Sequence, residues 1–181
     1  MLITTLPNLE HPEVLLRPII ASDLPVWAHY LRQPQVYQHT SWNLQSEREL
    51  DHNVWDSRTQ TADSPFRLAI ARRDTDQLVG TIGLHTVSSQ NKSCELAYDL
   101  SPSHWGRRIA SCAAQTMVQW AHQQADMTRI QATVLLANAP SIAVIERCGF
   151  QKEGLLRSFR QVRGQAMDFW LYSHLAGDSG K

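Results

Sequence analysis

The sequence lacks several features that would have assigned it to a specialised class of protein. Its 181 residues include only three cysteines, and no two of them form a Cys-x-x-Cys pair, so the sequence indicates neither a disulfide framework nor a zinc ribbon. The eight histidines form no His-Glu-x-x-His pattern, and no Gly-x-x-x-x-Gly-Lys-Ser/Thr loop is present. We therefore predict no metal site, and a P-loop nucleotide enzyme is disfavoured.

Long apolar runs and an excess of one charge are also missing. No stretch of about 18 uncharged apolar residues occurs, and the first residues carry neither a basic leader nor an apolar signal segment. Seventeen basic residues balance seventeen acidic ones, so no overall field would attract nucleic acid or an anionic membrane. The cysteines Cys94, Cys112 and Cys148 lie in apolar segments and suit a reducing compartment. We expect a soluble, cytoplasmic protein that binds neither nucleic acid nor membrane.

What is present suits one globular domain. The chain is 43% hydrophobic and 19% charged, which is enough apolar material for a single well-packed core. No repeat, low-complexity tract or linker divides it. We assign residues 1–13 to an N-terminal segment, 14–175 to the domain and 176–181 to a flexible tail.

Apolar periodicity predicts alternating strands and helices along the domain. Strands are predicted at Val14 to Arg17, Phe66 to Ala71, Leu78 to Leu84, Glu95 to Leu100, Ile130 to Leu136, Phe150 to Leu156 and Met167 to Tyr172. Helices are predicted after Ser22 or Asp23, after the capping box Ser46-x-x-Glu49 with Leu50, Val54 and Trp55 on one side, from Ile109 to Ala121, and over 139–148. The order β-α-α-β-β-β-α-β-α-β-β predicts a mixed α/β layer fold with parallel and antiparallel pairing.

The most informative stretch is residues 138–150, which read Asn-Ala-Pro-Ser-Ile-Ala-Val-Ile-Glu-Arg-Cys-Gly-Phe. Asn138 can cap a short helix, Pro140 suits its first turn, and Gly149 can close it. Asn138 and Ser141 are then predicted at the positive end of the helix.

Together with the strand, loop and helix over 93–121, this stretch resembles the cofactor-contacting half of the GCN5-related N-acetyltransferase (GNAT) family, most closely its RimJ/RimL branch. The element order is similar over nearly the whole chain. The resemblance implies a single-domain GNAT fold, with a central mixed, twisted sheet flanked by helices. It also implies transfer of an acetyl group from acetyl-CoA to a primary amine, with a protein N-terminal amine as the first candidate. A small-molecule amine (a polyamine, amino acid or aminoglycoside) and a non-catalytic acyl-CoA-binding module remain as alternatives.

The pyrophosphate of coenzyme A would lie at the start of the helix at Ile109, where free backbone N–H groups and the helix dipole favour an anion. The family turn typically reads Gln/Arg-x-x-Gly-x-Gly/Ala. Here Trp105 stands in place of the Gln or Arg, Arg108 stands in place of the first Gly, and only Ala110 keeps the pattern. Arg107 and Arg108 add guanidinium groups suited to phosphate, although a helix that begins with two solvated arginines explains them equally well. The predicted contacts in this loop are Trp105, Gly106, Arg107, Arg108, Ile109 and Ala110.

Glu95 is the candidate general base, because it lies on the strand that enters this loop, and histone acetyltransferases of the family carry their catalytic glutamate at a similar spacing. Strand alternation puts Glu95, Ala97 and Asp99 on one face of the sheet. A carboxylate there could remove the proton of an amine with a pKa of about 10. The alternative is a glutamate on a polar sheet face beside Asp99.

Ser141 is the candidate that stabilises or protonates the departing thiolate, since similar proteins use a serine at this place. Asn138 would position the pantetheine arm through its amide, although both residues also suit an ordinary helix start. Tyr98 and Tyr172 are reserve acids.

Three further coenzyme contacts are implied. Backbone N–H groups near Asp99 and Leu100 would stabilise the oxyanion, at a bulge that splays two strands. Arg147 would reach a phosphate, or else simply favours a helix C-terminus.

Acceptor selection is expected on the variable segments around Tyr37, His39 and Trp42, at Tyr98, and on the last hairpin. The hairpin arginines Arg157, Arg160 and Arg163 would clasp a carboxylate or an acidic peptide, or else remain solvated surface charges. The expected partner is an amine-bearing peptide or small molecule, and a homodimer is left open.

Overall fold

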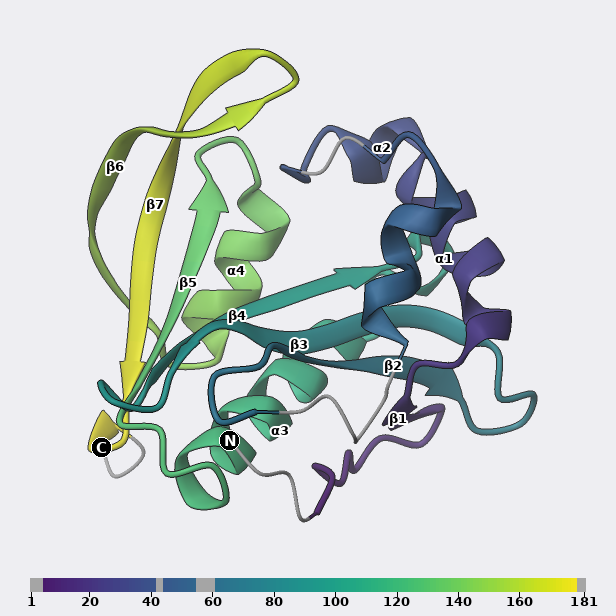
Figure 1. Cartoon of the computed structure of the whole chain (residues 1–181), viewed down its shortest axis with the longest axis horizontal. Helices are drawn as coiled ribbons and strands as arrows, with labels where there is room; N and C mark the ends of the chain where they lie inside the picture. Colours follow the sequence, from purple (N-terminus) through teal and green to yellow (C-terminus); the bar gives the residue numbers. More distant parts are fainter. Residues whose placement is uncertain (1–4, 42–43, 55–60, 179–181) are drawn as a thin grey trace.

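The computed structural model describes residues 5–41, 44–54 and 61–178, and its centre is a seven-stranded sheet with helices on both faces (Figure 1). The strands are β1 (Val14–Pro18), β2 (Phe66–Arg72), β3 (Leu78–Ser88), β4 (Ser93–Leu100), β5 (Arg129–Leu135), β6 (Gln151–Val162) and β7 (Gln165–Leu175). They lie in the order β1-β2-β3-β4-β5-β7-β6, and every neighbouring pair is antiparallel except the parallel pair β4–β5. The predicted mixed α/β fold is confirmed.

The predicted helices occur in the predicted order along the chain. The α-helices are α1 (Leu24–Leu31), α2 (Pro34–Tyr37), α3 (Ile109–Gln123) and α4 (Ala139–Arg147), and the 3-10 helices are η1 (Ala21–Asp23), η2 (Glu47–Asn53) and η4 (Pro102–His104). The short α2 was not predicted.

The capping box before η2 is confirmed, because the Glu49 carboxylate accepts the Ser46 N–H at 2.7 Å. The α-helix predicted after it is wrong, since the segment is a 3-10 helix in which only Leu50 is buried. One buried residue gives little packing energy to extend a helix, and the next apolar position, Val54, is only partly buried and has an extended backbone. Trp55 lies outside the described residues.

The two faces of the sheet are covered by different helices, as the alternation in β2 requires. Leu68 and Ile70 belong to the same buried cluster as Met117 of α3, whereas the intervening Ala69 belongs to the cluster of Trp27 in α1. Figure 1 shows α3 on one side of β2 and β3 and α1 on the other.

The sheet opens between β4 and β5. Their parallel pairing covers only Ser93 to Glu95 against Arg129 to Gln131, although β4 runs to Leu100 and β5 to Leu135. β5 instead pairs with β7 along its full length, so it turns away from β4 with its partner (Figure 1). The implied splay is therefore present. The prediction of a bulge near Asp99 and Leu100 is wrong. The register between β3 and β4 is regular there and shifts only beyond His85.

Candidate active site

A cavity of about 850 Å³ lies at this opening. Its walls come from β2 to β7, from α4, and from the chain between the end of α1 and η2. This volume lies within the range of pockets that hold small molecules. Three of the predicted functional side chains, Glu95, Tyr98 and Ser141, line it together.

A hydroxyl pair lies at the N-terminus of α4. The Tyr98 hydroxyl is 2.8 Å from Ser141 Oγ, and the Asn138 side-chain oxygen accepts the Ser141 backbone N–H at 3.1 Å. Asn138 therefore caps α4 as predicted, and Gly149 closes the helix with a φ of 84°. Burial raises the pKa of Tyr98, so its phenol stays protonated at neutral pH and can act as a proton donor.

Tyr172, the other reserve acid, does not take part in this pair. Its hydroxyl donates to the Glu146 carboxylate at 3.1 Å, and Tyr172 does not line the cavity. Burial also raises its pKa. The prediction for Tyr172 is wrong because strand alternation in β7 directs its ring beneath α4, into the main buried cluster.

The Glu95 carboxylate is buried, with 4% of the residue exposed, yet it borders the cavity. Its Oε1 accepts the Thr133 hydroxyl at 2.5 Å and Arg160 Nη2 at 2.9 Å. Oε2 has no hydrogen-bond partner among the described residues, and no fully buried polar side-chain atom in that part of the chain lacks one, so Oε2 must be accessible. One oxygen is thus fixed, and the other is open.

His85 lies opposite Glu95 on β3, where the register shifts, and it also lines the cavity. Its Nε2 is 3.8 Å from Glu95 Oε1. Burial lowers the pKa of His85, partly opposed by the Glu95 charge, which favours a neutral imidazole at pH 7. The sequence analysis missed His85 because nothing local distinguishes it. The polar alternation of Gln131 and Thr133 in an otherwise apolar strand could have identified Thr133.

The Asp99 side chain has a structural role. Its carboxylate accepts hydrogen bonds from Trp27 Nε1 at 3.1 Å and from the Tyr30 hydroxyl, both on α1. It also accepts Arg67 Nη1 at 3.0 Å and the Thr81 hydroxyl at 2.7 Å. This network fixes α1 to the sheet and occupies the carboxylate.

Strand alternation separates the two backbone donors predicted at the opening. The Ser101 N–H donates to the Val79 carbonyl of β3, and backbone groups two residues apart point the same way, so the Asp99 N–H also faces β3. The Leu100 carbonyl instead accepts the Trp105 indole N–H at 2.8 Å, so Leu100 points its backbone polar groups toward the opening. The Leu100 N–H therefore stays a candidate donor, whereas the Asp99 N–H is directed to β3.

The loop before α3 contains two residues with left-handed backbone, Gly106 and Arg108. Gly106 has a φ of 77°, and a Cβ placed there would meet no atom within 4 Å. Arg108, which replaces a glycine, adopts a left-handed φ of 61° as the N-cap of α3. Arg108 thus adopts a conformation that glycine favours, and no side chain caps the free N–H groups at the start of this 15-residue helix.

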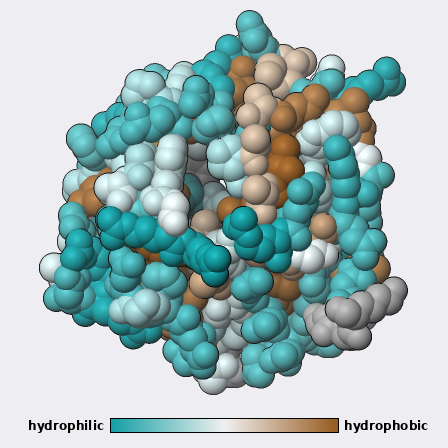
Figure 2. All heavy atoms as spheres, turned by 180° about the vertical axis from the view of Figure 1, so that it is seen from behind, coloured by the Kyte–Doolittle hydropathy of each residue, from teal (hydrophilic) through white to brown (hydrophobic). Residues whose placement is uncertain are grey.

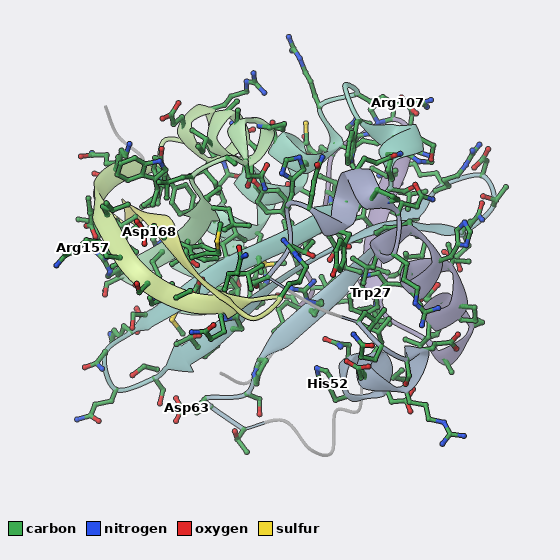
Figure 3. All side chains as sticks on the ribbon, turned by 90° about the horizontal axis from the view of Figure 1, so that it is seen from above. Trp27, His52, Asp63, Arg107, Arg157 and Asp168 are labelled. Atoms are coloured by element: carbon green, nitrogen blue, oxygen red, sulfur yellow. The ribbon has the colours of Figure 1, made fainter. Side chains whose placement is uncertain are left out.

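The two arginines of this loop differ in their contacts. Arg107 Nη1 pairs with the Glu13 carboxylate at 2.9 Å, and the Arg107 carbonyl lies 3.3 Å from His11 Nε2. Figure 3 shows Arg107 at the periphery of the molecule. The Arg108 guanidinium has no ion pair or hydrogen bond within the described parts of the chain. Arg108 is thus the one of the two whose charge is available to an anion.

Arg147 connects the two helix ends. Its guanidinium donates to Ser111 Oγ in the first turn of α3 at 3.3 Å. The Arg147 side chain belongs to the last turn of α4, where a positive charge is favourable. Its guanidinium nevertheless lies near the N-terminus of α3.

The residues predicted to select the acceptor separate into two groups. His39 lines the cavity, Trp42 lies outside the described residues, and Tyr37 borders a smaller recess of about 140 Å³ instead. Arg163, at the tip of the β6–β7 hairpin, stacks 4.5 Å from the Tyr37 ring centroid. It also donates to the carbonyls of Tyr37 and Thr40 at 3.0 and 3.1 Å, so the hairpin tip is tethered to the α2 segment.

The other two hairpin arginines point in different directions. Arg157 is exposed and projects outward from β6 in Figure 3. Arg160 lines the cavity and pairs with Glu95. The interpretation as a solvated charge therefore fits Arg157 alone.

Two general properties complete the description of the site. Over residues 5–41, 44–54 and 61–178, no group of three or more His, Cys, Asp or Glu residues could hold a metal ion. In the same part of the chain, no helix has the length and apolar character needed to cross a membrane.

Comparison with known proteins places the chain among acetyltransferases. The sequence model of the acetyltransferase (GNAT) domain matches residues 13–151. The chain is 29% identical over 164 residues to the uncharacterized N-acetyltransferase p20 of Bacillus licheniformis, covering 88% of this chain and 91% of p20. It is 28% identical over 159 residues to the L-amino acid N-acetyltransferase AaaT of Escherichia coli K12, covering 86% of this chain and 94% of AaaT. A solved structure of RimL, a ribosomal L7/L12 alpha-N-protein acetyltransferase in complex with coenzyme A, aligns with a TM-score of 0.79 at 19% identity, covering 91% of this chain and 95% of RimL.

Proposed function

Because the chain belongs to the GNAT acetyltransferase family, we propose that its cavity transfers an acetyl group from acetyl-CoA to a primary amine. One observation carries this proposal. A carboxylate with an open oxygen, Glu95 Oε2, and a hydroxyl pair, Tyr98 and Ser141, line the same cavity at the splay of β4 and β5. A proton acceptor on β4 and a proton donor at the start of α4 thereby border one opening, as acyl transfer to an ammonium requires.

The start of α3 fits the diphosphate of coenzyme A. Its free N–H groups, the open space at Gly106 and the unpaired Arg108 guanidinium form a cradle for an anion. Asn138 and the Leu100 N–H would hold the pantetheine arm and the acyl oxygen along the opening. Acetyl-CoA, when bound, supplies the acetyl group as an activated thioester. The solved RimL complex with coenzyme A supports the assignment of this ligand.

Glu95 acts as the general base in this proposal. Its Oε1 is held by Thr133 and Arg160, so Oε2 has a fixed orientation toward the cavity. Oε2 takes a proton from the acceptor ammonium, directly or through a water molecule, and releases the nitrogen lone pair for attack. Without this step the amine, with a pKa of about 10, stays mostly protonated at neutral pH.

Ser141 acts as the acid. Its Oγ provides the proton that the departing sulfur requires, and the Tyr98 hydroxyl at 2.8 Å can replace that proton. The position of Ser141 at the N-terminus of α4 also favours negative charge near its hydroxyl.

The acceptor defines two versions of the proposal. A protein N-terminal amine agrees with the similarity to RimL. A small-molecule amine is favoured by the tether of Arg163 to the carbonyls of Tyr37 and Thr40, which joins two walls of the cavity instead of leaving an open groove. AaaT, an L-amino acid N-acetyltransferase, is a relative with such an acceptor.

Two measurements test the proposal. Acetyl-CoA at about 100 times its dissociation constant should stabilise the fold by roughly 2.7 kcal/mol in a thermal-shift experiment. Mass spectrometry should then detect acetylation in a panel of peptides and small amines. No thermal shift at millimolar acetyl-CoA would exclude both catalysis and coenzyme sensing. A shift without any acetylated product would leave only a coenzyme-binding module.

Glu95→Gln tests the base. This variant keeps the size of the side chain but removes the proton acceptor, so turnover should fall about 100-fold or more, and most at low pH, where little free amine is present. An unchanged pH–rate profile would remove Glu95 from the mechanism.

A further inference from the structure

Arg160 is aimed into the cavity by an irregularity in β6. The β6–β7 register shifts just before Arg160, and Ser158 within this stretch has a left-handed φ of 51°. The Ser158 N–H is held by the Asp168 carboxylate of β7 at 2.7 Å. The guanidinium then lies 5.0 and 5.7 Å from the ring centroids of Phe159 and Phe169. Backbone geometry and aromatic rings thus fix the direction of this side chain.

Most of the hydrogen-bonding capacity of Arg160 is unused. A guanidinium has five N–H donors, and the described residues accept only from Nη2, through Glu95 at 2.9 Å. The side chain is 32% exposed and lines the cavity. The other arginine of the cavity wall, Arg67, differs because its guanidinium donates to Thr81 and Asp99. Arg160 can therefore offer two parallel donors to a ligand, and a carboxylate matches that geometry.

The neighbourhood of Arg160 tolerates a second anion. Two other acids line the cavity besides Glu95, namely Glu49 and Asp99. Asp99 accepts four side-chain donors, one of them Arg67, and Glu49 accepts the N–H groups of Ser46 and Gln45. Their charges are therefore already stabilised by local donors, which lowers their repulsion toward a carboxylate at Arg160.

From this arrangement we infer that the acceptor is an amine that carries a nearby carboxylate, such as an α-amino acid, and that Arg160 binds this carboxylate. The inference rests on the proposed acetyl transfer and names its substrate class. In this arrangement the ammonium of the acceptor lies at Glu95 Oε2 and its carboxylate lies at the Arg160 guanidinium. Each charge of the acceptor thus meets an opposite charge of the protein. A polyamine, or a peptide whose first residue is not acidic, has no carboxylate beside its amine and leaves the Arg160 donors without this partner.

A matched acceptor series measures this selectivity. Each amino acid is compared with its carboxamide, which keeps the amine and the side chain but lacks the negative charge, and kcat/KM is determined for both. The ratio of acid to amide should fall about 10- to 100-fold in Arg160→Gln, the range expected for losing a charge-assisted pair. Because both acceptors meet the same enzyme, a general loss of activity through the unpaired Glu95 cancels in this ratio. Arg160→Lys should keep part of the preference, since it keeps the charge but not the fork.

Arg157→Gln is the matched control, because Arg157 lies on the same strand and points outward. Its acid-to-amide ratio should equal that of the wild type. If Arg160→Gln fails to fold, binding to the wild type decides instead: N-acetyl amino acids should bind about tenfold or more tightly than their amides in calorimetry. A ratio unchanged in Arg160→Gln, or equal binding of the acid and amide products, would overturn the inference. Either result can occur in an active acetyltransferase, whereas failure of the proposed function would appear as no acetylation of any amine.

Discussion

At position 108 an arginine replaces the glycine of the family motif and adopts a backbone conformation that glycine favours. The arginine at this position holds the left-handed conformation that glycine adopts at lower cost, with a φ of 61°. Arg108→Gly should therefore raise the free energy of unfolding by up to about 1 kcal/mol. It should also weaken acetyl-CoA binding about tenfold, because a guanidinium beside the diphosphate is lost. Urea denaturation and calorimetry measure the two effects separately.

Arg108→Ala separates charge from backbone strain. Alanine loses the charge but keeps the unfavourable conformation, so coenzyme affinity should fall as in Arg108→Gly while stability does not rise. Tighter coenzyme binding in Arg108→Gly would instead mean that the side chain obstructs the cradle.

The Tyr98–Ser141 pair predicts a particular pattern of kinetic loss. Ser141→Ala should lower kcat about 10- to 100-fold with little change in coenzyme affinity, because the proton donor is removed but the cradle at α3 is not. Tyr98→Phe should cost less, since Ser141 remains. The double variant should be little worse than Ser141→Ala, because the two hydroxyls act as one unit. Additive losses would show that each hydroxyl acts independently.

The residues of the site differ in how well the sequence could predict them. Asn138 and Ser141 follow from a local rule, since a capping residue and the first turn lie within four positions of each other. The partners of Glu95 do not: Thr133 and Arg160 are 38 and 65 residues away, and their approach depends on strand order and on a shift in register. Local patterns therefore identified the candidate acid, whereas the surroundings of the candidate base required the structure.

At the scale of elements, α4 depends on its cap more than longer helices do. It has nine residues, and Ile145 is its one fully buried position. Asn138→Ala removes the acceptor for the Ser141 N–H and should lower the free energy of unfolding by about 1 kcal/mol in urea denaturation. Asn138→Asp is the control, because it keeps the cap and adds a charge that the helix dipole favours. Equal losses in both variants would mean that the cap contributes nothing.

Strand lengths were the least predictable property of the elements. β6 extends to Val162, beyond the predicted end at Leu156, because pairing with β7 continues after an irregular stretch. Regular alternation is lost where the register shifts, at Ser158, so the period-2 pattern stops although the strand does not. The β2–β3 pairing is regular over most of its length, and both strands were predicted correctly from their apolar runs.

The exposed surface of the whole molecule is uneven. The large exposed apolar side chains on or next to β5, β6 and β7 are Leu136, Leu155, Phe159, Met167 and Leu175. Figure 2 shows the molecule from behind. On the half of this view where α4 and the β6–β7 hairpin lie, hydrophobic side chains gather, while much of the rest of the view is hydrophilic. Net charge is zero, so this distribution, rather than an overall field, distinguishes one side of the protein.

The two halves of the sheet are joined by the short β4–β5 ladder and by one buried cluster that contains residues of both halves. One contact is a pair of histidines, His122 of α3 and His174 of β7, whose ring nitrogens lie 3.0 Å apart. His174 is 6% exposed and packs against Phe150. Burial, reinforced by the neighbouring His122, lowers the pKa of His174 below its ordinary value of 6.5. This pair therefore makes the stability of the fold depend on pH.

The direction of that link follows from the lowered pKa. Above pH 6.5 His174 is neutral in both the folded and the unfolded chain, and its packing contributes fully. As the pH falls below 6.5, the unfolded chain binds the proton first, so the free energy of unfolding should decline. Urea denaturation at pH 7.5 and pH 5.5 measures this decline. His174→Gln should have a lower free energy of unfolding than the wild type at pH 7.5, but that free energy should decline less between pH 7.5 and pH 5.5. His29→Gln is the control, because His29 is exposed on α1, and it should show the decline of the wild type. His85 and His104 also have pKa values lowered by burial, so part of the decline should persist in His174→Gln. An identical decline in His174→Gln and the wild type would mean that the two halves of the sheet are held together independently of this proton.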